Sequence, residues 1–194
     1  DHVIFTTDDG TVVRFNDPRR FGLMTLAAAD KLDGHKLFRH LGPDAMGADF
    51  TPAALSAALK GRKTSIKVAL LDQRIVVGVG NIYACESLHR AGISPKRMAG
   101  SIPKDRIAPL VAAIRKVLKD AIAAGGSTLR DHAQATGDPG NFQHHFLVYG
   151  REGQPCRRIA PRRASAGDEK SCTGTVKRIV QAGRSTFYCS KCQT

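Results

Sequence analysis

The residues best suited to chemistry are four cysteines near the end of the 194-residue chain. Cys189 and Cys192 are separated by two residues, which is the spacing of a zinc knuckle. Cys156 and Cys172 lie upstream and can complete a tetrahedral set of thiolates. The pattern predicts a zinc ribbon with one structural zinc ion, because four protein thiolates leave no open position for water.

The first cysteine pair departs from the usual ribbon pattern. A ribbon normally presents Cys-x2-Cys, whereas fifteen residues separate Cys156 from Cys172. Two arrangements fit this spacing. Either the polar insert 157–171 bulges out and all four cysteines bind zinc, or Cys156 is not a ligand and His144 or His145 replaces it.

Two further residues are placed where a polyanion could bind. Arg184 follows the predicted turn Ala182-Gly183, where its guanidinium can point outward to a phosphate or simply be solvated. Asn81 follows Gly78-Val79-Gly80 and is a natural N-cap of a helix. The same helix start also exposes backbone N–H groups on which a DNA phosphate could dock.

Two basic segments could add DNA contacts. In Asn16–Gly22, Phe21 lies beside Arg19 and Arg20, and an apolar wedge with a neighbouring arginine can fill a gap in the base stack. The alternative is that Phe21 belongs to the core and Asp17 forms a turn. A second basic cluster, for DNA-backbone contact or solvation, comprises Lys60, Arg62, Lys63 and Lys67.

The first half of the chain contains sequence signals for a β-hairpin and several helices that would position these residues. Val3–Thr7 and Thr11–Phe15 flank a turn and predict a β-hairpin. Helices are expected from Thr51-Pro52 to Gly61, over Ser65–Asp72, and from Asn81 to Ala91. The chain starts within a predicted strand and without Met, so we interpret it as a fragment whose N-terminal part is missing.

The second half contains the clearest helix and the ribbon strands. Residues 104–124 carry an apolar stripe at helical spacing: Ile107, Val111, Ile114, Leu118 and Ile122. Residues 134–145 lack periodicity and predict a loop. Strands are expected over Thr175–Gln181 and Ser185–Tyr188. The last 45 residues hold ten Lys and Arg and three Asp and Glu, with too little apolar material for a core without metal.

Charge and composition narrow the class of protein. Thirty Lys and Arg against seventeen Asp and Glu give a net charge of +13 and a pI near 10.0, which is typical of a polyanion binder. No apolar run approaches a membrane span, and no charged segment followed by an apolar one opens the sequence, so we do not expect a secreted or membrane protein. In such an unexported chain the cysteines favour a metal site over disulfides, and the isolated Cys85 is expected to be a buried free thiol.

The motifs together resemble formamidopyrimidine-DNA glycosylase, the bacterial base-excision enzyme for 8-oxoguanine and ring-opened purines. They follow the family's order along the whole chain: NDPRRFG (16–22), HLGP (40–43), LLDQ (70–73), GVGNIYACE (78–86), AGISP (91–95), GGSTLRD (125–131), VYGREGQPC (148–156) and GRSTFYCSKCQ (183–193). The resemblance implies an α+β fold in four parts: the end of an N-terminal β-sandwich (1–33), a helix-two-turns-helix domain (34–135), a lesion-covering loop and linker (136–146), and a zinc-ribbon finger (147–194).

The resemblance also implies roles for single residues. Arg19 and Phe21 resemble the residues that enter the void left by a flipped nucleotide, and Arg62 and Lys67 resemble backbone and lesion-site contacts. Asn81 resembles the phosphate ligand, and Arg184, the implied catalytic residue of this chain, resembles the zinc-finger arginine that assists the δ-elimination. Residues 134–143 resemble the loop over the flipped base, and the zinc ligands are Cys156, Cys172, Cys189 and Cys192.

The implied activity is that of a bifunctional DNA glycosylase and abasic-site lyase. It would act as a monomer on damaged double-stranded DNA in the bacterial cytoplasm, near the nucleoid and without a membrane partner. The family's N-terminal Pro-Glu and its early lysine have no counterpart in this sequence, and the insert 157–171 interrupts the first knuckle. A non-catalytic DNA-binding fragment and the sister glycosylase for oxidised pyrimidines therefore remain alternatives.

Overall fold

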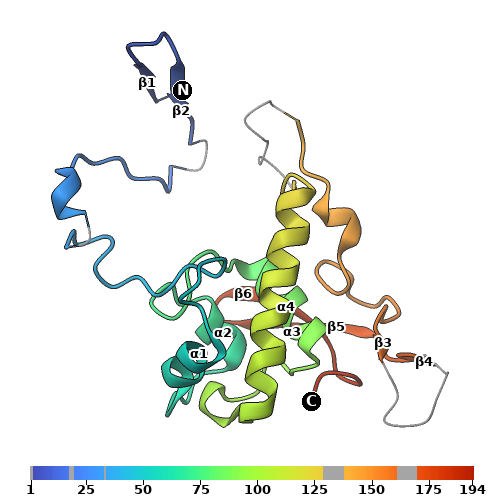
Figure 1. Cartoon of the computed structure of the whole chain (residues 1–194). Helices are drawn as coiled ribbons and strands as arrows, with labels where there is room; N and C mark the ends of the chain where they lie inside the picture. The colour runs from blue at the N-terminus through green and yellow to red at the C-terminus, as the bar shows by residue number, and fades with distance from the viewer. Residues whose placement is uncertain (1, 18–19, 33, 129–137, 161–169) are drawn as a thin grey trace. The chain divides into compact units, whose positions relative to one another are not determined.

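The computed structural model describes residues 2–17, 20–32, 34–128, 138–160 and 170–194, and the chain divides into two compact units (Figure 1). The first unit is Asp1–Arg39 and the second is His40–Thr194. The second unit contains all the helices longer than one turn among the described residues, together with the four ribbon cysteines. No helix in the described part of the chain is long and apolar enough to span a membrane.

The first unit contains the predicted hairpin. Strands β1 (Val3–Thr6) and β2 (Val12–Phe15) pair antiparallel, from Val3 opposite Phe15 to Thr6 opposite Val12. The Asp9 carboxylate accepts hydrogen bonds from the Thr11 N–H and the Thr7 hydroxyl, and Gly10 adopts a φ of 83°. The turn chemistry expected of Asp8-Asp9-Gly10 is therefore confirmed. A single 3₁₀ turn, η1 (Ala29–Lys31), follows.

Four helices build the main core of the second unit: α1 (Pro52–Leu59), α2 (Ile66–Leu70), α3 (Asn81–Ala91) and α4 (Lys104–Ala123). The Thr51 hydroxyl caps α1 by accepting from the Ala54 N–H at 3.1 Å, with Pro52 at the first helical position, as the sequence predicts. A 3₁₀ turn, η2 (Ala99–Ser101), precedes α4. The fully buried residues of this core include Leu55, Leu70, Leu88, Leu110 and Ile114.

The long helix α4 follows its predicted apolar stripe except at the end. Ile107, Val111, Ile114 and Leu118 are buried, but Ile122 is 68% exposed and the smaller Ala121 is buried instead. The reason is the helical period. At about 3.6 residues per turn, a residue fifteen positions after Ile107 has drifted about 60° away from the core-facing line.

Two local predictions were wrong. Asn81 is the first helical residue of α3 rather than its N-cap, which is Gly80 and makes no side-chain cap. Within the predicted loop 134–145, Phe142–His145 form a 3₁₀ turn, η3, while residues 134–137 lie outside the described part. The turn forms because Phe142 is fully buried against the rings of Tyr83 and Phe146, whose centroids lie 5.9 and 5.8 Å away.

The ribbon consists of β5 (Val176–Gln181) and β6 (Arg184–Cys189), paired antiparallel from Val176 opposite Cys189 to Gln181 opposite Arg184. Ala182 and Gly183 form the two-residue turn with φ angles of 47° and 71°, the left-handed conformation that such hairpins require. The ends of the insert pair as β3 (Ile159–Ala160) and β4 (Lys170–Ser171), and residues 161–169 between them lie outside the described residues.

The ribbon is attached along helix α3, and this attachment positions the candidate site. The buried Glu86 carboxylate of α3 accepts hydrogen bonds from the backbone N–H groups of Leu147, Val148 and Tyr149, each at 2.9 Å. Cys85, on the same helix, packs with Val148, Val176 and Phe187. At the chain end, the Gln193 amide donates to the Ile93 carbonyl at 2.9 Å. The helices and the ribbon therefore share one set of contacts around α3.

Candidate zinc centre and nucleic-acid interface

The four ribbon cysteines form a site for one metal ion. Their sulfur atoms all lie within 4.8 Å of one another, and the distances from Cys156 Sγ to Cys192 Sγ and from Cys172 Sγ to Cys189 Sγ are both 3.7 Å. A tetrahedral zinc site with Zn–S bonds of about 2.3 Å has sulfur atoms about 3.8 Å apart. All four cysteines are free of disulfides. The geometry fits zinc bound by four thiolates, and a closed four-thiolate site is structural.

The structure decides between the two arrangements that the insert left open. The Cys156 N–H donates to the Gly174 carbonyl and the Cys172 N–H to the Arg158 carbonyl, both at 2.8 Å. These hydrogen bonds close the base of the insert and bring Cys156 and Cys172 together despite their separation in sequence. The replacement of Cys156 by His144 or His145 is therefore wrong: both histidines are exposed and neither joins the sulfur cluster.

Two features around the sulfur atoms bear on metal binding. A Cβ at Gly174 would lie 2.5 Å from Cys189 Sγ and 2.8 Å from Lys191 Cβ, so only glycine fits against the cluster. Burial raises the pKa of the Cys156 thiol to about 11. Thiols must lose their protons to bind zinc, so binding the ion displaces a proton that the protein environment alone retains.

His89 on α3 touches this centre and was missed by the sequence analysis. Its Nε2 atom lies 3.2 Å from Cys156 Sγ and 3.9 Å from Cys192 Sγ, and its side chain is fully buried. Burial, followed by the charges of Arg158, Arg90 and Arg151, lowers the pKa of His89 to about 4. The only available signal was the position of His89 one helical turn after Cys85, which says nothing about residue 156.

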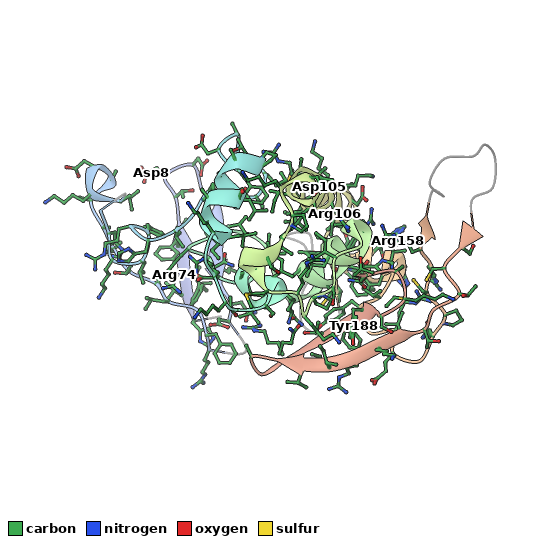
Figure 2. All side chains as sticks on the ribbon, turned by 90° about the horizontal axis from the view of Figure 1, so that it is seen from below. Asp8, Arg74, Asp105, Arg106, Arg158 and Tyr188 are labelled. Atoms are coloured by element: carbon green, nitrogen blue, oxygen red, sulfur yellow. The ribbon has the colours of Figure 1, made fainter. Side chains whose placement is uncertain are left out.

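Arg158 approaches the same edge of the centre from the insert. Figure 2 shows it between the helices and the end of the ribbon nearest the β3–β4 hairpin. Its Nη1 atom donates to the Cys192 carbonyl at 3.0 Å, and a Cβ at Gly92 would overlap its guanidinium. The C-terminal end of α3 is therefore in close contact with the chain that carries the zinc ligands.

A second candidate site lies at the other end of α3. A hollow of about 340 Å³ is lined by Gly80, Asn81, Ile82, Tyr83, Ser127, Tyr149 and Arg184. The Asn81 amide donates to the Ser185 carbonyl at 3.0 Å and to the Tyr149 hydroxyl at 3.2 Å. Asn81 thus anchors the first residues of β6, where Arg184 is exposed. Two residues that are 103 positions apart in sequence share one hollow.

The second basic cluster, Lys60, Arg62, Lys63 and Lys67, does not form a single solvated patch. Lys60 and Lys63 are exposed, but Lys67 is fully buried and its Nζ atom has no hydrogen-bond partner among the described residues. Burial lowers the pKa of Lys67; the neighbouring Cys85 opposes this shift, and the Arg184 charge adds to it. Lys67 is buried because it belongs to the inner side of α2, which packs on α3. A buried ammonium without a partner is typical of a functional site.

Arg62 and Cys85 complete these surroundings. The Arg62 Nε atom donates to the Ala58 carbonyl at 2.7 Å, and its Nη1 atom lies 3.8 Å from the Asp72 carboxylate. The Arg62 guanidinium therefore already has two polar partners within the protein. Cys85 is 1% exposed and free, and burial raises its pKa to about 11, as expected of a buried thiol.

The wedge segment belongs to the first unit. Phe21 is 80% exposed there, so the alternative of a core position does not hold within the unit. Asp17 does form a turn, since its carbonyl accepts from the Arg20 N–H and its carboxylate from the Gly22 N–H. Arg19 lies outside the described residues, as does part of the loop 134–143.

Comparison with known proteins identifies both parts of the second unit. Residues 41–133 match the family model described as the formamidopyrimidine-DNA glycosylase H2TH domain, and residues 170–194 match the zinc finger found in FPG and IleRS. Formamidopyrimidine-DNA glycosylase of Ruegeria sp. (strain TM1040) is 58% identical over 193 residues, and that of Paracoccus denitrificans is 53% identical. All of this chain is covered in both cases, and it spans 64% of each relative's length.

Solved structures agree with the sequence matches. The MutM (Fpg) protein from Thermus thermophilus superposes with a TM-score of 0.80 at 39% identity, covering 98% of this chain and 67% of that one. Lactococcus lactis Fpg in complex with DNA containing an abasic site gives a TM-score of 0.72 at 31% identity, with coverages of 86% and 56%. The α+β fold with a helix-two-turns-helix domain and a zinc ribbon is confirmed, and the chain belongs to the formamidopyrimidine-DNA glycosylase family.

Proposed function

We propose that this chain is the DNA-binding and zinc-finger part of a base-excision repair enzyme. The enzyme would release oxidised purines from double-stranded DNA and then cleave the strand by β- and δ-elimination. It would act as a monomer in the bacterial cytoplasm. The observation that carries the proposal is the meeting of Asn81, at the start of α3, with Arg184, at the start of β6, in one open hollow.

The chemistry of this hollow suits a DNA phosphate. Helix α3 has eleven residues, and its first backbone N–H groups point out of the helix end, where they favour an anion. Arg184 adds a charge that persists at any working pH, and Tyr149 adds a hydroxyl. Phosphate contacts of this kind position DNA without reading its sequence.

Arg184 would also take part in the chemistry. A guanidinium cannot readily give up a proton, so it is a poor general acid. It can instead hold the phosphate that leaves in the δ-elimination and stabilise the negative charge that develops there. The buried Lys67, whose charge interacts with that of Arg184, would contact the lesion site.

The other site residues would act on the flipped nucleotide and its flanks. Phe21, exposed in the first unit, would enter the stack together with Arg19, because an apolar wedge stabilises the gap that base flipping leaves. Arg62 would contact the DNA backbone at the expense of its weak ion pair with Asp72. In this assignment residues 1–33, 34–135, 136–146 and 147–194 are the sandwich end, the helical DNA-binding domain, the lesion-covering loop with its linker, and the finger.

The glycosylase step needs an amine that attacks C1′ and expels the base as an imine forms. Family resemblance assigns that amine to an N-terminal proline, for which residues 1–194 offer no match. The 194-residue chain by itself should therefore bind lesion DNA without forming a covalent adduct. A chain that also carries the family's Pro-Glu start should form the adduct.

The test is borohydride trapping on duplexes containing 8-oxoguanine or an oxidised pyrimidine, run on both chains. Trapping by the longer chain, with preference for 8-oxoguanine, supports the proposal. Failure of the longer chain to trap either lesion would leave a non-catalytic DNA-binding protein, and preference for the pyrimidine would indicate the sister enzyme.

Binding by the 194-residue chain is tested separately through its salt dependence. If about five phosphates are neutralised, log K against log salt should have a slope of roughly −4 to −5. Arg184→Gln should reduce the magnitude of the slope by about one. Lys177→Gln is the matched control, because it removes the same charge from an exposed position on β5 outside the hollow. Equal effects of the two variants would contradict the assigned phosphate site.

A further inference from the structure

One edge of the zinc centre faces helix α3 rather than solvent. Cys156 and Cys192 form this edge, with their sulfur atoms 3.7 Å apart. His89 Nε2 lies over the edge, 3.2 Å from Cys156 Sγ and 3.9 Å from Cys192 Sγ. The ring is fully buried, so no solvent competes for this nitrogen.

His89 is outside the first coordination shell. The group of ligand atoms within 4.8 Å of one another contains the four cysteine sulfurs and, in the described parts of the chain, no histidine nitrogen. Four thiolates already satisfy zinc. An imidazole beside two zinc-bound sulfurs can act on the ion only through those sulfurs.

We propose that His89 is a positioning residue of the zinc centre, whose Nε2–H group donates a hydrogen bond to the Cys156 thiolate and, more weakly, to that of Cys192. Such a donor withdraws electron density from the thiolate and fixes its direction toward the metal. Outer-shell hydrogen bonds of this kind tune metal sites and orient their ligands. The contact also joins the zinc centre to α3, whose first residue, Asn81, lines the hollow proposed to bind a DNA phosphate.

The surroundings of the ring favour the tautomer that this role requires. With its proton on Nε2, the donor points to sulfur. A proton on Nδ1 would have no acceptor among the described residues, because that atom is buried and without a partner. Two hydrogen bonds fix the backbone around this contact: Arg158 donates to the Cys192 carbonyl at 3.0 Å, and the Thr194 N–H donates to the Gly92 carbonyl at 3.1 Å.

The first test uses the unmodified zinc-loaded protein. Nitrogen-15 chemical shifts of the His89 ring, read from long-range proton–nitrogen spectra, report which nitrogen carries the proton. We expect the proton on Nε2. A proton on Nδ1 would overturn the proposal outright, because Nε2 could then only accept.

The second test compares variants of α3. His89→Phe removes the donor and keeps a ring of similar size, while His89→Gln can return an N–H to the same place. Ser87→Ala is the matched control, since Ser87 is equally buried on α3 and its hydroxyl has no partner in the described structure. Zinc affinity is measured by chelator competition, and the thiolate electronics by the sulfur-to-metal charge-transfer band of the Co(II)-substituted protein.

His89→Phe should bind zinc roughly 10- to 100-fold more weakly and shift the charge-transfer band to lower energy, without changing the tetrahedral d–d bands. His89→Gln should recover part of both effects. If His89→Phe keeps the wild-type band, or if Ser87→Ala weakens zinc binding equally, His89 acts only through packing and the proposal fails. Should His89→Phe not fold, His89→Gln and the tautomer measurement still decide.

Discussion

The helical core and the ribbon of the second unit reach stability by different routes. The helices bury a continuous set of large apolar side chains, including Phe50, Leu70, Leu110 and Ile114. The ribbon strands β5 and β6 bury few residues, chiefly Val176, Phe187 and Tyr188, and leave Val180 66% exposed. One region has an apolar core of its own, and the other needs a metal ion to replace the core that it lacks.

The comparison also shows where the two regions depend on each other. Helix α3 packs in the helical core through Leu88 and holds the ribbon through Cys85, Glu86 and His89. A helix with two buried faces serves both regions. Loss of zinc should therefore loosen one face of α3 while the other face remains packed.

The largest expected effect is the loss of zinc. Replacing Cys189, whose side chain is fully buried, with Ser should remove a metal contribution on the order of 10 kcal/mol and unfold the ribbon. Helices α1 and α4 should remain, since their core does not include the ribbon. Metal analysis and amide hydrogen exchange would measure both effects. Less than half an equivalent of zinc in folded wild-type protein, or unchanged exchange in the ribbon of the variant, would contradict the comparison.

The reciprocal change is Leu110→Ala in the helical core. Leu110 is fully buried in α4, and its truncation should cost roughly 2–5 kcal/mol through lost burial and the cavity left behind. Chemical denaturation of the zinc-loaded protein measures the loss. The variant should retain its zinc, because no thiolate is touched. If the variant released its zinc at denaturant concentrations where the helices are still folded, the stability of the ribbon would depend on the helical core, contrary to the comparison.

Arg184→Ala should change chemistry with little effect on either region. Arg184 is exposed at the first residue of β6, so fold and zinc content should be preserved. In a chain with the family's N-terminal amine, borohydride trapping should survive, while δ-elimination should slow by roughly a hundredfold to a thousandfold. Gel analysis would show accumulation of the β-elimination product. If the variant gave the wild-type ratio of β- to δ-elimination products, Arg184 would bind the DNA phosphate without a role in catalysis.

The smallest expected effect is a pH-dependent contribution of Asp72 to the stability of the helical region. Hydrogen bonds from the Arg74 side chain, reinforced by the Arg62 charge, lower the pKa of Asp72 in the helical region. Asp72 therefore adds to the free energy of unfolding at pH values above its unfolded-state pKa of about 3.9. This contribution is lost as the pH falls through the pKa of Asp72 in the folded protein, which is lower. Asp72→Asn should cost no more than about 1 kcal/mol near neutral pH, because Arg74 is largely exposed.

The measurement is the difference in the free energy of unfolding of the helical region between wild type and Asp72→Asn, from about pH 7 down to about pH 2. The difference should shrink toward acid pH, while zinc release should follow thiolate protonation equally in both proteins. A difference that grows as pH falls would give Asp72 the opposite sign and refute the assignment.

Much of this protein could be predicted from short stretches of sequence. The Thr51-Pro52 helix start, the Asp8-Asp9-Gly10 turn, the apolar stripe of α4 and the Cys189–Cys192 knuckle each depend on residues only a few positions apart. Their signals are dihedral preferences, caps and periodicity, which act locally. The motifs also carried the family resemblance, which the comparisons confirm.

Other features depended on contacts that no local signal encodes. Lys67 looked like part of a solvated cluster until α2 packed on α3, and Asn81 looked like a cap until β6 offered it the Ser185 carbonyl. Cys156 could be counted as a zinc ligand only after the insert closed at its base. The sequence by itself determined the main helices, the ribbon strands and the Cys189–Cys192 half of the ligand set. Tertiary structure alone decided that His89 reaches a sulfur 67 residues away, because burial and orientation arise only when distant segments pack.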